Sequence, residues 1–363
     1  MPRVRPRSGM AAWRPRAADS SAAHRVTGGG FGGRGASLPV SALRKEFRCL
    51  PPFARAYAHY TNALARFVCD LSHWMTLSEV AALSHLGWDT VKEIVKADLA
   101  RRYGHISIKD VKRIAIDEIY VGKKAKFLTL VINLDTGQII HVAKGRGQEA
   151  LRKFWRRVRM SKARIEAAAC DMSAAYWSAI LEHLPQAALV FDHFHIIKLA
   201  NEKIDDLRRA LWHEADILKR NAIKGSRYLL LMGAENLPED RREKLQEALR
   251  FNEPLSVAYY LKEELRLLWS QPSFEHMSRF LHNWCAKALE TGIVQMMSLA
   301  KTLRAHATGI LNFFHHPISS GKLEGINNKI ACLKRAAYGY RDHEFFTLKL
   351  YSLHESSLRL SGV

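Results

Sequence analysis

Arg113-Ile-Ala-Ile-Asp-Glu-Ile-Tyr-Val121 has the apolar composition of a buried β-strand, with Asp117 at its centre. Two more strands are predicted after it, over residues 126–134 and 138–142, and Asp135-Thr136-Gly137 between them is typical of a hairpin turn. An acidic side chain inside such a strand is costly to bury unless it is paired or binds a metal ion. Asp117 is therefore the first candidate functional residue, and a solvated strand end is the alternative.

The following residues predict a change from antiparallel to parallel strands. Helices are expected over 148–160 and 174–184, and short apolar strands over 165–170 and 188–191. Three antiparallel strands followed by parallel strands with crossover helices form a mixed sheet, the order found in ribonuclease H-like folds. The sequence therefore predicts an α/β fold, which a nearly all-helical segment, residues 195–315, interrupts.

Two more carboxylates stand at the ends of predicted elements. Asp171 closes the strand that ends at Cys170, and Glu324 lies early in a helix predicted over residues 321–334. Each also has a purely structural explanation, because Asp171 can cap the next helix and Glu324 can complement a helix N-terminus. Taken one residue at a time, the sequence leaves both explanations open.

Residues 77–95 have the pattern of a helix-turn-helix, whose second helix enters the DNA major groove. Asp89 is predicted to cap that second helix, and His85 stands in the turn at a position where glycine is common. Four basic residues are left to contact phosphates or bases: Lys92, Lys96, Arg101 and Arg102. An ordinary helical hairpin is the alternative.

The composition favours a polyanionic partner. The 363 residues include 56 Lys and Arg against 35 Asp and Glu, a net charge of +21, which points to nucleic acid or an anionic membrane surface. No run approaches the roughly 20 apolar residues that a membrane span requires. The five cysteines are odd in number and widely spaced, which supports neither a disulfide scaffold nor a zinc ribbon and favours reduced thiols in a cytoplasm.

Several motifs occur together in one order along the chain. They are Arg113-Ile-Ala-Ile-Asp-Glu-Ile119, Leu128-Thr-Leu-Val-Ile-Asn-Leu-Asp-Thr-Gly137, Cys170-Asp-Met-Ser-Ala-Ala-Tyr176, Val190-Phe-Asp-His-Phe-His-Ile-Ile-Lys-Leu-Ala-Asn201 and Gly321-Lys-Leu-Glu-Gly-Ile-Asn-Asn-Lys329. This set resembles the DDE transposases of bacterial insertion sequences in the ISL-three group, over residues 50–356.

The resemblance implies a catalytic triad of Asp117, Asp171 and Glu324. These carboxylates would hold two Mg²⁺ (or Mn²⁺) ions, which suit DNA cleavage at element ends and strand transfer into target DNA. Asp192 and His195 match the Asp-x-x-His element that precedes the helical insertion of this class, although the sequence alone equally allows a helix cap at Asp192 and a core histidine at His195. We expect further residues of the Glu324 helix to support the site or hold DNA phosphates: Asn327, Asn328, Lys329, Lys334 and Arg335.

The same resemblance implies DNA as the partner, both transposon ends and target, bound by a homodimer or higher oligomer. It further implies a cytoplasmic, nucleoid-associated protein with no membrane partner. Two alternatives stay open from the sequence. One is a non-catalytic or truncated DNA-binding remnant, and the other is a ribonuclease H-like nuclease without strand transfer.

One departure from the family concerns the N-terminus. Members of this group usually carry a cysteine-rich zinc-binding module ahead of the helix-turn-helix, whereas residues 1–48 contain no cysteine. This departure predicts a truncated copy with weaker recognition of terminal repeats. Five segments are expected: a disordered basic leader (1–40), a helical DNA-binding region with the helix-turn-helix (41–110), the ribonuclease H-like catalytic domain (111–200 and 317–363) and a helical insertion (201–316).

Overall fold

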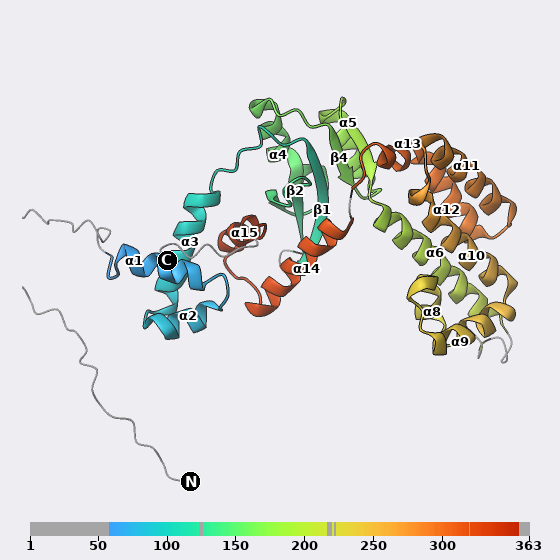
Figure 1. Ribbon diagram of the computed structural model, residues 1–363, viewed down its shortest axis with the longest axis horizontal. Helices are drawn as coiled ribbons and strands as arrows, with labels where there is room; N and C mark the ends of the chain where they lie inside the picture. Colours follow the sequence, from blue (N-terminus) through green and yellow to red (C-terminus); the bar gives the residue numbers. More distant parts are fainter. Residues whose placement is uncertain (1–57, 123–125, 216–219, 221–222, 319, 356–363) are drawn as a thin grey trace, which may run out of the picture. The chain divides into compact units, whose positions relative to one another are not determined.

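The computed structural model describes residues 58–122, 126–215, 220, 223–318 and 320–355 (Figure 1). The predicted leader, residues 1–40, lies outside the described residues. Along the described part of the chain, none of the helices is long and apolar enough to cross a membrane.

A five-stranded mixed sheet forms the centre of the α/β part of the fold (Figure 1). Its strands are β1 (Arg113–Gly122), β2 (Lys126–Asn133), β3 (Ile139–Lys144), β4 (Ala167–Cys170) and β5 (Ala188–Phe191). Their order is β3-β2-β1-β4-β5, with β1 antiparallel to β2 and parallel to β4, and β5 parallel to β4. The predicted ribonuclease H-like α/β fold is confirmed.

Each face of the sheet is covered by its own helices. Helices α4 (Gln148–Ser161) and α5 (Ala174–His183) pack over Ile114 and Ile116, whereas α14 (Ser320–Ala336) packs over Ala115 and Ile119. Because successive side chains of a strand point to opposite faces, Asp117 shares the α14 face and Glu118 the α4 and α5 face.

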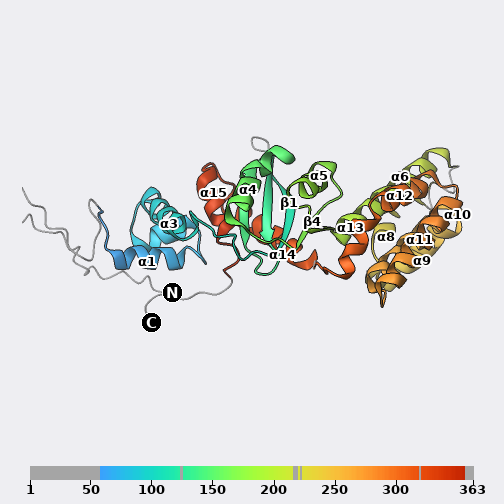
Figure 2. The ribbon, with the colours of Figure 1, turned by 90° about the horizontal axis from the view of Figure 1, so that it is seen from above.

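The helical insertion follows β5 directly, and both views show its helices gathered together (Figures 1 and 2). It comprises α6 (His193–Glu214), α8 (Arg227–Leu231), α9 (Glu239–Arg250), α10 (Glu253–Arg266), α11 (Phe274–Glu290), α12 (Val294–Ala305) and α13 (Ala307–Leu311). Trp284 is fully buried, and its indole N–H donates to the carbonyl of Leu261 at 2.8 Å. The insertion returns to the strand it left, because the Asn312 amide donates to the Leu189 carbonyl of β5 at 2.8 Å.

Three helices form the helix-turn-helix region: α1 (Asn62–Leu71), α2 (Leu77–Ser84) and α3 (Trp88–Tyr103). A capping box between Thr76 and Glu79 starts α2, since each side chain accepts a hydrogen bond from the other residue's backbone N–H. The prediction that Asp89 caps α3 is wrong. Gly87 is the N-cap, and Asp89 lies in the first turn, where its negative charge favours the positive end of the helix dipole.

His85 ends α2 in the left-handed backbone conformation, with φ 54° and ψ 31°. A side chain with a Cβ adopts this region at a cost of about 1–2 kcal/mol, and glycine adopts it freely. We expect His85→Gly to raise the free energy of unfolding by about 1 kcal/mol in urea titrations, because relief of strain exceeds the added entropy of the unfolded chain. His85→Ala keeps the Cβ and should show no gain. Equal stability of the two variants would contradict this account.

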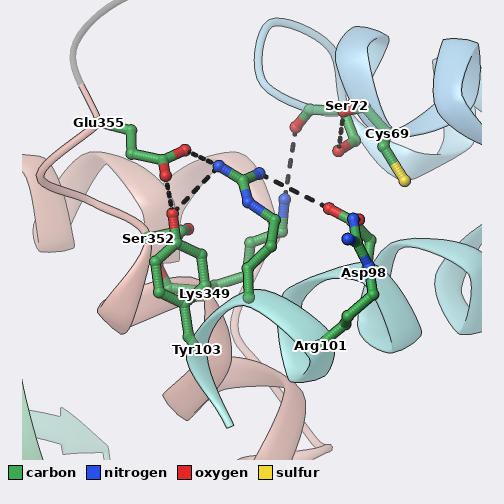
Figure 3. Close-up of polar contacts among 9 residues, drawn as sticks. Cys69, Ser72, Asp98, Arg101, Tyr103, Lys349, Ser352 and Glu355 are labelled. Carbon is green, nitrogen blue, oxygen red and sulfur yellow. Dashed lines mark hydrogen bonds and ion pairs between the residues drawn. The ribbon is translucent and has the colours of Figure 1, made fainter. Parts of the chain in front are cut away.

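Helix α15 (His343–Tyr351) is shared between two hydrophobic cores. Phe346 and Leu350 pack with the sheet and α14, whereas Phe345 and Leu348 pack with the helices of the helix-turn-helix region. Polar contacts continue this junction (Figure 3). Glu355 accepts hydrogen bonds from Tyr103 and Arg102, and the Lys349 ammonium donates to the carbonyl of Ser72.

Burial at this junction lowers the pKa of Lys349 to about 8, from an ordinary value of 10.5. Between these two values the unfolded chain binds more protons than the folded one, so Lys349 makes stability rise with pH. Between pH 7 and pH 10, we expect the free energy of unfolding of the unmodified protein to increase by about 1–2 kcal/mol more than that of the Lys349→Met variant. Urea titrations of both proteins across that range test this, and parallel pH profiles would rule it out.

Candidate active site

Three aspartates occupy equivalent positions on neighbouring strands. In the parallel β1–β4 pair, Ala115 lies opposite Ala169, so Asp117 and Asp171 both come two residues later. In the β4–β5 pair, Cys170 lies opposite Phe191, so Asp171 and Asp192 both come one residue later. The strand register therefore places Asp117, Asp171 and Asp192 in one row across β1, β4 and β5. This row lies at the ends of β4 and β5.

Asp117 is partly buried, and both of its carboxylate oxygens accept hydrogen bonds. The backbone N–H of Glu118 donates to Oδ1 at 2.7 Å, and the Asn327 amide of α14 donates to Oδ2 at 2.8 Å. Asn327 Oδ1 is itself buried and has no hydrogen-bond partner among the described residues. The contact brings α14 to the strand that carries Asp117, across 210 residues of sequence.

Asp171 is partly buried and accepts a hydrogen bond at Oδ1 from the Ser173 N–H at 3.0 Å. The cap explanation for this residue is wrong, since α5 begins at Ala174 with Ser173 as its N-cap.

The cap explanation holds for Asp192, a buried residue that accepts the Phe194 N–H at the start of α6. Its Oδ2 lies 3.2 Å from Nδ1 of His195, which is half-buried rather than a core residue. The hydrogen bond with Asp192 raises the pKa of His195 against the effect of burial, and the charges of Asp117 and Asp171 add to the rise. Burial opposes a low pKa of Asp192, but the hydrogen bonds from His195 and Phe194 hold that pKa below its usual value.

Glu324 lies on α14 one turn before Asn327, so both residues share one side of the helix. Its side chain is exposed. Within the part of the chain that the structure describes, no group of three or more His, Cys, Asp and Glu side chains is close enough to hold a metal ion. The structure thus aligns Asp117 and Asp171 and docks the Glu324 helix beside them, but it does not bring the three carboxylates together as one cluster.

Two lysines fix α14 on the sheet on either side of Asn327. Lys322 donates to the carbonyl of Leu134 at 3.0 Å, and Lys334 donates to the carbonyl of Tyr120 at 2.6 Å. Three other predicted residues of this helix are exposed: Asn328, Lys329 and Arg335.

The basic residues predicted on the second helix of the helix-turn-helix are all engaged with carboxylates. Lys92 lies 3.0 Å from Asp342, and Lys96 lies 3.2 Å from Asp342 and 2.7 Å from Glu344. Arg101 pairs with Asp98 at 2.6 Å, and Arg102 pairs with Asp98 and Glu355. For Lys92 and Lys96 to reach a DNA phosphate, the pairs with α15 have to open.

A polar network that no sequence motif indicated lies on the other face of the sheet. The Tyr176 hydroxyl donates to Glu118, accepts the Gly147 N–H at 3.0 Å, and lies 3.1 Å from the Thr129 hydroxyl. This network joins the start of α4 to the strand that carries Asp117. The strand alternation placed Glu118 on this face, but no local pattern identified Tyr176 as its partner.

The donor set of the site suits a hard divalent cation. Asp117 and Asp171 supply carboxylate oxygens, and the unpartnered Oδ1 of Asn327 lies beside Asp117. Mg²⁺ and Mn²⁺ prefer oxygen ligands of this kind and retain several waters. The residues present therefore fit the ions that the family resemblance implies.

Comparison with known proteins identifies the chain. A family model of DDE transposases of the ISL3 (ISL-three) group, described as "Transposase", matches residues 114–350. The chain belongs to the ISL3 transposase family. A second model, the "Helix-turn-helix domain of transposase family ISL3", matches residues 49–99 of this ISL3 transposase, which confirms the predicted motif.

Curated relatives of this ISL3 transposase are themselves transposases. The transposase for insertion sequence element IS1001 of Bordetella parapertussis is 34% identical over 84% of this chain and 76% of its own length. The transposase for insertion sequence element IS1557 of Mycobacterium tuberculosis is 30% identical over 80% of this chain and 71% of its own length. Among solved structures, the Drosophila P element transposase strand transfer complex aligns with a TM-score of 0.42 at 13% identity, covering 83% of this chain and 94% of that one.

Proposed function

We propose that this transposase cuts DNA at the ends of an insertion sequence and joins the freed ends to target DNA. The observation that carries the proposal is the hydrogen bond from Asn327 to Asp117. It docks the helix of Glu324 against the strand of Asp117, and the register of β1 and β4 aligns Asp117 with Asp171. These two contacts support a shared site for three acidic residues that lie far apart in sequence.

In this proposal Asp117, Asp171 and Glu324 hold two Mg²⁺ or Mn²⁺ ions, with Asp117 shared between them. When bound, two such ions stabilise the attacking and leaving oxygens of an in-line displacement at phosphorus. Asn327 holds the Asp117 carboxylate in a fixed orientation through its amide N–H. Asp192 caps α6 and forms a hydrogen bond with His195, whose pKa the charges of Asp117 and Asp171 also raise.

One arrangement of residues serves two successive reactions. With water as the nucleophile, a phosphodiester bond at the element end breaks, the leaving oxygen takes a proton, and a 3′-hydroxyl is freed. With that 3′-hydroxyl as the nucleophile, a bond forms to a target phosphate, and a target-strand 3′ oxygen leaves. Because the second reaction exchanges one phosphodiester for another, no external energy source is needed.

DNA is the proposed partner at both steps, bound by a homodimer or higher oligomer of the transposase in the cytoplasm at the nucleoid. The helix-turn-helix region, residues 41–110, is proposed to read the element ends. The catalytic domain is proposed to comprise residues 111–200 and 317–363, with the insertion, residues 201–316, between its two parts.

An oligonucleotide assay tests this function. The full chain is incubated with Mg²⁺, a labelled duplex that contains the element end, and a supercoiled target plasmid. The expected products are a nicked end with a free 3′-hydroxyl and a labelled plasmid joined to that end. Nicking without joining would support the ribonuclease H-like nuclease, and binding with neither product would support the non-catalytic remnant.

A further inference from the structure

The outer face of helix α4 is almost entirely basic, with Glu149 as its one acidic residue. Its inner face is fixed by Leu151, Phe154, Trp155 and Val158, all buried against the sheet. The outer positions include Lys153, Arg156 and Arg159, which are exposed. Lys162 and Arg164 continue the exposed basic run beyond the end of the helix.

These five cations have no carboxylate partner among the residues that the structure describes. The acidic side chains nearby are engaged elsewhere, since Glu149 pairs with Arg152 and Glu166 pairs with Lys112. Basic residues three apart on a helix repel one another and destabilise it. The spacing of Lys153, Arg156 and Arg159 therefore carries a repulsive cost, and none of the ion pairs among the described residues includes these three side chains.

Helix α9 shows what a solvated face looks like in the same protein. It has four basic and four acidic residues in 12 positions, whereas α4 has five basic residues and one acidic residue in 14. Both helices are amphipathic, with three or four buried apolar side chains. Exposure to solvent alone does not require the strong excess of basic residues on α4.

We propose that the outer face of α4 is a binding track for the phosphate backbone of duplex DNA, separate from the helix-turn-helix. From Lys153 to Arg159 the helix rises about 9 Å, the axial length of two to three phosphates on one DNA strand. Beyond the Glu149–Arg152 pair, the exposed side chains of the face from Lys153 to Arg159 are basic, which suits contacts with phosphates rather than with one base sequence. The hydrogen bond from Gly147 to Tyr176 anchors the start of the track beside β1.

This inference rests on the proposed function only in that the partner is DNA. The test compares two full-length triple variants with the same loss of charge. One is Lys153→Gln/Arg156→Gln/Arg159→Gln on α4, and the other is Arg241→Gln/Lys244→Gln/Arg250→Gln on α9. Affinity for a random-sequence duplex is measured by fluorescence anisotropy in EDTA, over a series of salt concentrations.

The α4 variant is expected to bind roughly tenfold or more weakly at about 100 mM salt, with the slope of log K against log salt reduced by about 2–3. The α9 variant should retain most of the affinity and slope. Thermal unfolding should show the α4 variant at least as stable as the parent, because like-charge repulsion is removed. Equal losses in both variants would mean that only net charge matters and would overturn the proposal. Strand cleavage of element-end DNA, measured separately, reports on the catalytic proposal independently of this result.

Discussion

Asp117→Asn is expected to reduce Mg²⁺-dependent nicking of element-end DNA by about 10³-fold or more. The change removes a charged oxygen ligand proposed to be shared by two metal ions, and such ions contribute several kcal/mol to stabilisation of the transition state. DNA affinity should be unchanged or slightly higher, because phosphate contacts come from Lys and Arg and one negative charge is lost. Nicking rates and a binding titration at fixed salt measure the two effects separately.

Glu118→Gln is the matched control, since it makes the same chemical change one residue along the same strand. Glu118 lies on the opposite face, where the glutamine carbonyl still accepts the hydrogen bond from Tyr176. Its nicking rate should stay within about tenfold of the parent. Parent-level nicking by Asp117→Asn, or equal losses in both variants, would contradict the assignment of Asp117.

Gly309→Ala is expected to destabilise the protein by about 2 kcal/mol or more. Gly309 lies on α13, where the insertion returns to β5, and a Cβ built on it falls 2.5 Å from two ring carbons of Phe191. Phe191 is 2% exposed, so its ring has no free space to enter. Because Phe191 directly precedes Asp192, its displacement should also lower the nicking rate of the folded variant.

Gly325→Ala provides the opposite case. This glycine lies in α14, and a Cβ on it meets nothing within 4 Å. Alanine is the better helix former, so the variant should gain about 0.5–1 kcal/mol in the free energy of unfolding. Urea titrations of the two variants should therefore move in opposite directions. A neutral Gly309→Ala would show that the contact with β5 adapts easily.

The sheet was predictable from sequence because its strands carry strong local signals. The run from Arg113 to Val121 is apolar, Gly137 supplies the positive φ of the predicted hairpin turn, and short apolar segments end at Asp171 and Asp192. The predicted fold class is confirmed. It also accounts for the neighbouring positions of Asp171 and Asp192, because the parallel strands that precede them end at the same edge of the sheet. The roles proposed for these residues stay predictions.

The remaining features depend on contacts that no local pattern encodes. The ion pair of Lys96 with Asp342 joins residues 246 positions apart, so the helical pattern that left Lys96 available for phosphates contained no sign of its partner. The prediction that Asp89 caps α3 was wrong because Gly and Asp are both acceptable N-cap residues. The backbone conformation of the turn makes Gly87 the N-cap. The exposed position of Glu324 reflects how α14 docks on the sheet, which the sequence of the helix alone does not specify.

Helix α15 limits how this transposase can exchange parts with its relatives. Phe345 and Leu348 complete the core of the helix-turn-helix region, although they lie more than 240 residues after α3 and follow α14. A recombination event that replaced only the first 110 residues would leave these side chains facing a foreign surface. Such an exchange is therefore expected to give a stable protein only if one face of α15 changes with it.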